Sequence, residues 1–277
     1  MALAIQQVLT SIADALDKDE LVLPTLPEVA LRVRDAAADP NTDMGRLSKE
    51  INSDAALSAR IIKVANSPLL RTGQDITDIK MATMRLGMDY TVNIATALAM
   101  EQMFQATSDI VDKRMRQTWL HSSEVAGLCH VLCKHKTSLK TDMATLGGLV
   151  HQIGILPILS FAEERPAILK NSDILDSIIE KIHPAIGDKI LQKWEFPKEL
   201  RHVPTQHLEF NRSADSADYA DIVTVATLQI EIGREQVNEN IDYSSVTSFG
   251  RLGLEPDTSA HAEDINEEII AAMAMLN

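Results

Sequence analysis

Short stretches of helical periodicity, each bounded by residues that start or end helices, constrain the fold of this chain more than any other feature. The first clear stretch follows Pro27, whose missing N–H does no harm in the first turn of a helix, and it stops at Asp39-Pro40. Few segments alternate between apolar and polar residues as a half-buried strand would. The pattern therefore predicts an all-α protein.

Helices with brief loops are expected along the whole chain. The expected helices cover residues 1–16, 27–38, a segment capped by Thr42 or Asp43, a segment capped by Ser53 or Asp54 that ends at Asn66-Ser67-Pro68, a segment from Thr77 or Asp78 to Gly87, 90–104 capped by Asp89, 115–136, 141–153, 173–182, 184–194, 197–203, 217–232 and 262–276. We expect a break at 154–157 and irregular structure over 238–258.

Length and composition agree with a helical, globular chain. The 277 residues allow one large domain or two modest ones, and aromatic residues make up only 4% of them. Residues 106–112 form the natural boundary between two halves. We therefore expect an N-terminal helix (1–22), an N-terminal helical bundle (23–108) and a second helical lobe (109–277) that ends in a C-terminal helix.

The net charge restricts the partners of the protein. A formal charge of −14 argues against a nucleic-acid binder, because phosphate contacts need clustered Lys and Arg. It also argues against docking on an anionic membrane surface. We expect a protein partner, with a nucleotide as a possible small ligand, and the sequence leaves the oligomeric state open.

The N-terminal residues and the thiols indicate a compartment. No basic stretch followed by an apolar segment marks a signal peptide, and no apolar run approaches the ~18 residues of a membrane span. Cys129 and Cys133 share one helix face and are expected to be buried, reduced thiols. The protein is expected to be cytoplasmic.

Several blocks of the sequence resemble one bacterial family. They are Leu23-Pro24-Thr25-Leu26-Pro27-Glu28-Val29-Ala30-Leu31, the block 53–67, the stretch 79–98 with Leu86-Gly87, Trp119-Leu120-His121-Ser122, Gly148-Leu149-Val150-His151-Gln152-Ile153-Gly154, His183-Pro184-Ala185-Ile186-Gly187 and Trp194-Glu195-Phe196-Pro197. In their order and spacing they are similar to the HDOD family, over roughly residues 20 to 235. The resemblance implies a two-lobed all-α fold, a C-terminal lobe like that of the HD phosphohydrolases, and an output or regulatory role in signal transduction.

The same resemblance identifies the positions of an HD-type metal site. His121 matches the first ligand, His151 matches the histidine of the His-Asp pair, and His183 and His207 match accessory histidines of the HD-GYP-like branch. Such sites also use carboxylates, which offset the metal charge and bridge paired ions. Here Gln152 replaces the paired aspartate.

Further departures lie in the last part of this site. Thr227 stands where the final aspartate ligand is expected, and Leu208 follows His207 where a second histidine is often found. Pro204 is expected to interrupt the helix that presents His207. We therefore expect no catalytic residues and no bound metal, with the histidines as vestiges of an older site.

Each histidine also has a simpler interpretation. His121 can be a helix residue at the lobe interface, His151 can donate to a backbone carbonyl in the core, and His183 can lie just outside a helix start. His130, His135, His202 and His261 match no motif and are read as surface or ordinary core residues.

The N-terminal bundle supplies another candidate site. Asn66 and Ser67 follow a helix that carries Arg60, and these three residues are candidates for contact with a partner or ligand. A helix C-cap with a turn at Pro68 is the favoured interpretation of Asn66 and Ser67. Met81, Met84 and Met88 could form an adaptable binding surface, but core packing is the favoured interpretation.

Three functions follow from these residues. The preferred one is a non-catalytic signalling domain that binds a protein partner. The first alternative is a metal-dependent phosphohydrolase that acts on a nucleotide or cyclic dinucleotide and holds Fe, Mn or Zn, with Glu124 or Asp221 supplying a carboxylate. The second is a sensor that binds a nucleotide without hydrolysing it.

Overall fold

The structure is a computed structural model that describes Thr10, Ile12 and residues 22–71, 73–234, 241–256 and 262–276. Every regular element among these residues is helical, which confirms the predicted all-α class. The elements are α2 (Glu28–Ala38), α3 (Met44–Asn52), α4 (Ala55–Ala65), α5 (Ile79–Leu86), α6 (Met88–Met100), η1 (Glu101–Met103), α7 (Asp109–Lys136), α8 (Thr141–Val150), α9 (Ile155–Glu163), α10 (Pro166–Leu169), α11 (Ser172–Lys193), α12 (Val203–Gln206), α13 (Tyr219–Gly233), η2 (Tyr243–Ser245), α14 (Thr247–Arg251) and α15 (Ala262–Leu276).

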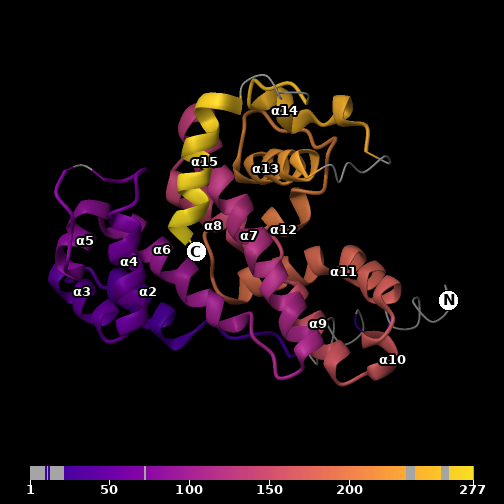
Figure 1. Cartoon of the computed structure of the whole chain (residues 1–277), viewed down its shortest axis with the longest axis horizontal. Coiled ribbons are helices and arrows are strands. Elements are labelled where there is room, and N and C mark those ends of the chain that lie inside the picture. The colour runs from indigo at the N-terminus through magenta and orange to yellow at the C-terminus, as the bar shows by residue number, and fades with distance from the viewer. Residues whose placement is uncertain are drawn as a thin grey trace.

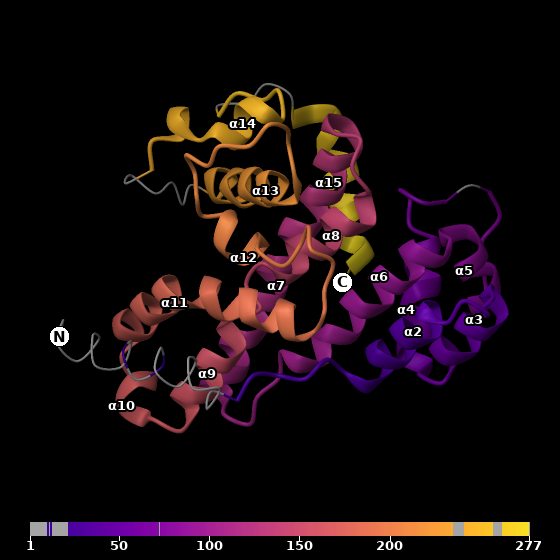
Figure 2. The same cartoon turned by 180° about the vertical axis from the view of Figure 1, so that it is seen from behind.

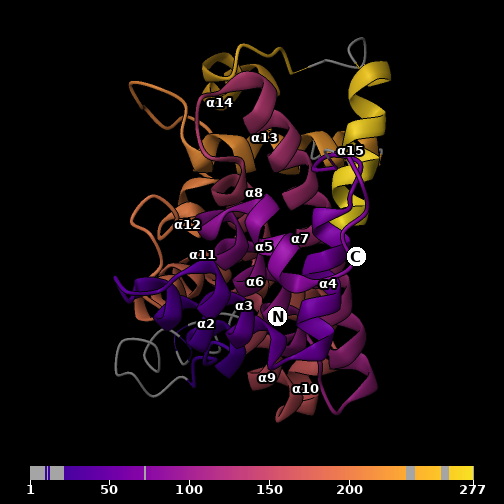
Figure 3. The ribbon, with the colours of Figure 1, turned by 90° about the vertical axis from the view of Figure 1, so that its left-hand side faces the viewer.

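These elements form two groups joined by one core. Figure 1 shows α2 to α6 on one side and α7 to α14 on the other, and Figure 2 shows the same division from behind. A single cluster of buried apolar side chains runs from the first group into the second, because α6 packs against α8. In Figure 3 the first group faces the viewer and the second lies behind it.

The C-terminal helix α15 connects the two groups. It packs along α7, and its last turn reaches α4, where the Arg60 guanidinium donates to the Leu276 carbonyl oxygen over 2.8 Å. Near its middle, the Glu268 carboxylate accepts from Lys134 of α7. Helix α15 therefore ties the N-terminal bundle to the longest helix of the other lobe.

The predicted caps of the N-terminal bundle are present. Asp43, Asp54 and Asp78 each accept a hydrogen bond from the backbone N–H three residues further on, at the starts of α3, α4 and α5. Gly87 ends α5 with φ of 80°, in the left-handed region that glycine tolerates best. These local signals placed the helix starts correctly.

Other boundaries differ from the predictions. Helix α7 begins at Asp109 rather than at 115, and α6 begins at Met88, so that Asp89 lies in its first turn and does not cap it. No helix was predicted between residues 154 and 172, but α9 starts at Ile155 with Pro157 in its first turn, and α10 follows it. The predicted helix 1–16 lies outside the described residues apart from Thr10 and Ile12, which are helical.

In the second lobe, the helix boundaries predicted from proline residues were wrong. Pro184 does not separate two helices but lies within the single helix α11, and most of the predicted helix 197–203 forms turns (198–202). Pro204 does not interrupt a helix either, because it occupies the first turn of α12, where its missing N–H is tolerated. Part of the segment 238–258, expected to be irregular, forms η2 and α14.

One apolar segment proved longer than the sequence analysis allowed. Within the described residues, Thr141–Glu163 has the length and apolar composition of a membrane span, yet 83% of its 18-residue apolar window is buried inside the protein. This is the environment of a core segment. The two cysteines on α7 are buried and unpaired, as predicted, and burial raises the pKa of both thiols.

Candidate functional site

Four histidines from four different elements come together and form what we call the histidine cluster. His121 lies on α7, His151 follows α8, His183 lies within α11 and His207 follows α12. The ring centroids of His121 and His151 are 5.8 Å apart, those of His151 and His207 are 5.1 Å apart, and those of His183 and His207 are 6.5 Å apart. The four positions that the family resemblance singled out are therefore neighbours in space.

Two glycines allow the elements that carry the cluster to approach one another. A Cβ atom on Gly154 would lie 2.0 Å from the carbonyl oxygen of His183, and one on Gly187 would lie 2.7 Å from Cβ of Pro204. No side chain fits at such distances. Glycine at these positions lets the turn after α8 contact α11, and lets α11 contact α12.

Replacing Gly154 with alanine is therefore expected to destabilise the protein by about 3 kcal/mol, since the new methyl group would force α11 away from the turn. Urea denaturation measures the free energy of unfolding. The matched control is Gly250→Ala on α14, where no atom lies within 4 Å of the added Cβ, and this variant should stay within about 1 kcal/mol of wild type. Equal stability of the two variants would contradict the close approach.

Backbone carbonyls set the tautomer of three of these rings. The Nδ1 atoms of His151, His183 and His207 donate to the carbonyl oxygens of residues 148, 179 and 203, at 2.6, 2.8 and 2.9 Å. A carbonyl oxygen only accepts, so each Nδ1 carries the hydrogen and each Nε2 is left with a lone pair. This confirms the simpler interpretation of His151, whereas His183 lies inside a helix and not at a helix start.

Burial keeps the rings neutral. His151 is fully buried and His207 is 3% exposed. Burial, reinforced by the positive charge of Arg234, lowers the pKa of His121 to about 4, and burial likewise lowers the pKa of His207 to about 4. The pKa values of His151 and His183 are lowered as well, chiefly by burial. Their Nε2 atoms are buried and have no hydrogen-bond partner in the structure.

The carboxylates named as substitutes are engaged elsewhere. Glu124, one turn after His121 on α7, pairs with Arg234. Asp221 on α13 is fully buried and accepts from Arg212 and Arg251. Both carboxylates therefore neutralise arginines, which are poor neighbours for a dication.

The two side chains that replace the aspartates of the HD pattern carry no charge. Gln152 lies in the turn after α8 and is partly exposed, and Thr227 lies on α13 with its hydroxyl buried and unpartnered. Among the described residues, no three His, Cys, Asp or Glu side chains are arranged to hold a metal ion. The donor set does not fit a two-metal centre, because such a centre needs a carboxylate to offset charge and bridge the ions.

The Asp221 carboxylate organises the chain that follows His207. It accepts from Arg212 at 2.7 Å, from Ser248 at 2.8 Å and from Arg251, so it joins α13 to α14 and to the loop before α13. Burial alone would raise its pKa, but hydrogen bonds from Arg251 and Ser248, with the backbone N–H of Asp218, outweigh this and lower it. Asp221 is therefore an ionised structural anchor.

The candidates in the N-terminal bundle have internal partners. The Asn66 side chain donates to the Ile76 carbonyl at 2.7 Å and accepts from its N–H at 2.8 Å, which closes the loop between α4 and α5. Arg60 donates to the carbonyl of Leu98 as well as to that of Leu276 and pairs with Glu101. The Ser67 hydroxyl is buried and unpartnered.

The bundle nevertheless exposes part of the methionine set. Met81 is 52% exposed and Met84 is 65% exposed, so core packing, the favoured interpretation, is wrong for these two. Met88 is partly buried against the core.

Sequence reasoning missed the contact that joins the lobes at the end of α11. Arg34 of α2 donates to the carbonyl oxygens of Trp194 and Glu195, at 2.7 and 3.2 Å, and the Trp194 indole donates to the Pro24 carbonyl at 3.0 Å. Both Trp194 and Pro24 belong to blocks that carry the family resemblance. Their partners lie 160 to 170 residues away in the sequence, and no local pattern connects them.

The helical architecture and the clustered histidines correspond to the class that the resemblance implied. The HDOD domain model matches residues 23–210, which is more than half of the chain. A solved structure from Shewanella amazonensis SB2B, called "Putative metal-dependent phosphohydrolase", is 32% identical, covers 99% of both chains and superposes with a TM-score of 0.87. This protein belongs to the HDOD family.

More distant structures share the fold. An HDOD domain protein of unknown function from Geobacter sulfurreducens is 18% identical over 99% of both chains, with a TM-score of 0.70. A "Putative signal transduction protein" from Marinobacter aquaeolei VT8 is 21% identical, with a TM-score of 0.63, over 94% of this chain and 61% of the other. No curated protein matches the sequence.

Proposed function

We propose that this protein is a non-catalytic, cytoplasmic regulatory domain of bacterial signal transduction that acts by binding a protein partner. One observation carries the proposal. Among the described residues, neither carboxylate named as a substitute ligand for the histidine cluster is free, because Glu124 is paired with Arg234 and Asp221 with Arg212 and Arg251. Neutral imidazoles alone do not offset the charge of paired metal ions or bridge them. The fold would then act by presenting surfaces to a partner and not by catalysis.

A metal-dependent phosphohydrolase is the second candidate. The unpartnered, buried Nε2 atoms of His151 and His183 favour it, since metal-ligating histidines use the tautomer that these rings adopt. The name of the Shewanella amazonensis relative points the same way. This candidate requires an additional anionic ligand within the cluster.

Metal analysis and a hydrolysis assay separate the two. We expect purified protein to contain less than stoichiometric Fe, Mn or Zn and to leave bis(p-nitrophenyl) phosphate uncleaved when these metals are added. Stoichiometric metal, with hydrolysis that is lost on chelation and in His151→Ala, would establish the enzyme instead. His202→Ala is the matched control, because His202 is exposed and lies outside the cluster.

A gain-of-binding variant tests the stated reason. Gln152→Asp combined with Thr227→Asp restores the two carboxylates of the HD pattern. We expect this double variant to retain more metal than wild type, because carboxylates add charge to the existing imidazoles. Equal metal content in the two proteins would show that the missing carboxylates are not what limits binding.

A further inference from the structure

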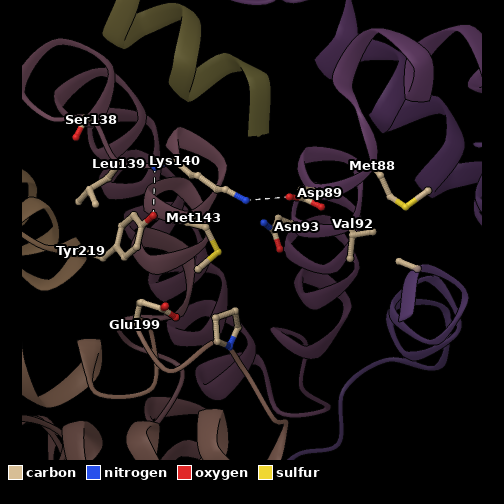
Figure 4. A pocket seen from close by; sticks show the side chains of 12 residues that line it. Met88, Asp89, Val92, Asn93, Ser138, Leu139, Lys140, Met143, Glu199 and Tyr219 are labelled. Atoms are coloured by element: carbon tan, nitrogen blue, oxygen red, sulfur yellow. Dashed lines mark hydrogen bonds and ion pairs between the residues drawn. The ribbon is translucent and has the colours of Figure 1, made fainter. Parts of the chain in front are cut away.

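A groove runs between α6 and the C-terminal lobe, away from the histidine cluster. Its central hollow, of about 590 Å³, has Met88, Val92 and Asn93 of α6 on one wall and Leu139, Met143 and Pro197 on the other. Figure 4 shows these two walls facing each other. We call this hollow and its continuations the interlobe groove.

Two further hollows extend the groove along α6. One of about 340 Å³ shares Val92, Asn93 and Pro197 with the central hollow, and one of about 360 Å³ shares Met88 and Asp89 with it. Because neighbouring hollows share lining residues, the three lie in a row along α6. Such a row suits an extended chain better than a compact ligand.

The lysine at one end of the groove is already paired. The ammonium group of Lys140 pairs with Asp89 across the groove at 2.9 Å, and the side-chain amide of Asn93 donates to Asp142 at 2.6 Å. Figure 4 shows the pair between Lys140 and Asp89. Because Asp142 also lines this end, it does not attract an anion.

The other end is cationic. Arg34, Lys198 and Arg201 line its hollow, and Glu195 is the one carboxylate among the described lining residues. In the part of the chain that the structure describes, none of the three cations forms an ion pair with a carboxylate. Arg34 and Arg201 hydrogen bond to backbone carbonyls, which leave the charges in place. An anion would be attracted here.

The cationic wall is rigid. At the end of α11, the N–H groups of Glu195 and Phe196 donate to the carbonyl oxygens of Gln192 and Leu191. Glu195 adopts φ of 54°, in the left-handed region that glycine usually occupies at such a helix end. A wall already fixed in this way loses little conformational entropy on binding.

The aromatic residues at the cationic end and in the central hollow do not offer a platform for a nucleobase. Phe196 is 1% exposed and Tyr219 is 6% exposed, so neither ring presents a free face. Recognition of single bases commonly depends on stacking against such a face. Tyr90 is partly exposed, but it lines the opposite end of the groove, together with Asp142.

The central hollow is mostly apolar, and its charged lining residues are Glu199 and the paired Lys140 and Asp89. With cations at one end, the groove instead complements apolar side chains followed by carboxylates.

We propose that the interlobe groove binds an extended segment of a protein partner, with apolar side chains in the central hollow and acidic side chains at Arg34, Lys198 and Arg201. This assignment rests on the proposed partner-binding function and gives it a location. The acidic residues set the direction of the bound segment, because only one end of the groove carries unneutralised cations.

A library of random peptides displayed on phage, selected against the full chain, tests this assignment. We expect enriched peptides to combine apolar residues with adjacent Asp or Glu. The synthetic form of an enriched peptide should bind Lys198→Glu/Arg201→Glu at least about tenfold more weakly than wild type. Changing its acidic residues to lysine should restore binding to this double variant.

The matched control reverses two lysines outside the groove. Lys113 and Lys181 are exposed, so Lys113→Glu/Lys181→Glu makes the same change in net charge and should bind like wild type. Equal weakening in both double variants, or enrichment of basic peptides, would overturn the assignment. A nucleotide such as GMP that raises the melting temperature of wild type but not of Lys198→Glu/Arg201→Glu would assign the groove to small anions instead.

Different outcomes test the assignment of the groove and the proposed function separately. Peptides that bind wild type and Lys198→Glu/Arg201→Glu equally well would leave partner binding intact and place it elsewhere. Metal-dependent hydrolysis, in contrast, would overturn the proposed function but would not contradict peptide binding in the groove.

Discussion

Acidification from about pH 6.5 to pH 4 is expected to remove several kcal/mol of folding stability, at up to about 1.4 kcal/mol per pH unit for each buried histidine. The contributing residues are His121, His130, His151, His183 and His207. Burial lowers each pKa below the ordinary value of 6.5, so the unfolded chain binds these protons first. The stability is present above pH 6.5 and is lost as the pH falls toward the folded-state values.

Urea denaturation at several pH values in EDTA measures this loss as the slope of unfolding free energy against pH. The variant His151→Leu has one fewer proton-binding group, and we expect its slope to be smaller by up to about 1.4 kcal/mol per pH unit. Carboxylates with lowered pKa, such as Asp221, lose their contribution at lower pH, below their ordinary value of 3.8. An unfolding free energy that does not change between about pH 7 and pH 5 would contradict the expected neutral cluster.

Replacing Asp221 with asparagine is expected to cost about 3–5 kcal/mol, because it leaves the nearly buried guanidinium group of Arg251 without its counter-charge and leaves Arg212 with Asp218 as its remaining carboxylate partner. The Arg212 and Arg251 side chains are 12% and 14% exposed, and Asp221 is fully buried. An asparagine side chain keeps the shape but offers one acceptor and no charge. The loop between His207 and α13 should lose order first, since this carboxylate anchors it.

Chemical denaturation gives the loss of stability, and amide hydrogen exchange over residues 208–218 gives its location. Asp176→Asn is the matched control, because Asp176 is 57% exposed where it pairs with Arg114 and should contribute less than about 1 kcal/mol. A loss for Asp221→Asn no larger than that of the control would show that water reaches the two arginines. The Asp221 carboxylate would then be less important to the fold than its contacts indicate.

The two variants also distinguish structural charge from functional charge in this fold. Asp221 was a candidate metal ligand because it is a carboxylate. In the structure it accepts hydrogen bonds from Arg212 and Arg251 and forms an internal ion pair with them. His151, in contrast, lies at the centre of the histidine cluster, within 5.8 Å of His121 and 5.1 Å of His207. Sequence position alone did not separate these two roles.

Much of the N-terminal bundle was predictable because its signals are local. Asp43, Asp54 and Asp78 act within one helical turn, and Gly87 acts through its own φ angle. In the C-terminal lobe the same reasoning failed at Pro184, where packing on both sides of α11 outweighs the loss of one backbone hydrogen bond. It failed again at 154–157, where α9 forms inside the core.

The exposure of side chains was less predictable than the helices. Met81 and Met84 lie on a helix with a clear apolar period, yet they face solvent. The buried face of α5 is the one that carries Ala82 and Thr83. Periodicity identifies an apolar face, but it does not say whether another element covers that face.

The sequence by itself determined that this chain is helical and where most of its helices start, because these depend on neighbouring residues. Motif order also identified the four histidines that lie together, and it marked Gln152 and Thr227 as departures from the HD pattern. Only the tertiary structure decided which groups meet. It placed the four rings together, gave Glu124 and Asp221 to arginines, and brought Arg34 to residues about 160 positions away. The reason is that such contacts depend on how whole helices pack, and close approaches such as Gly154 against His183 are not written in any local pattern.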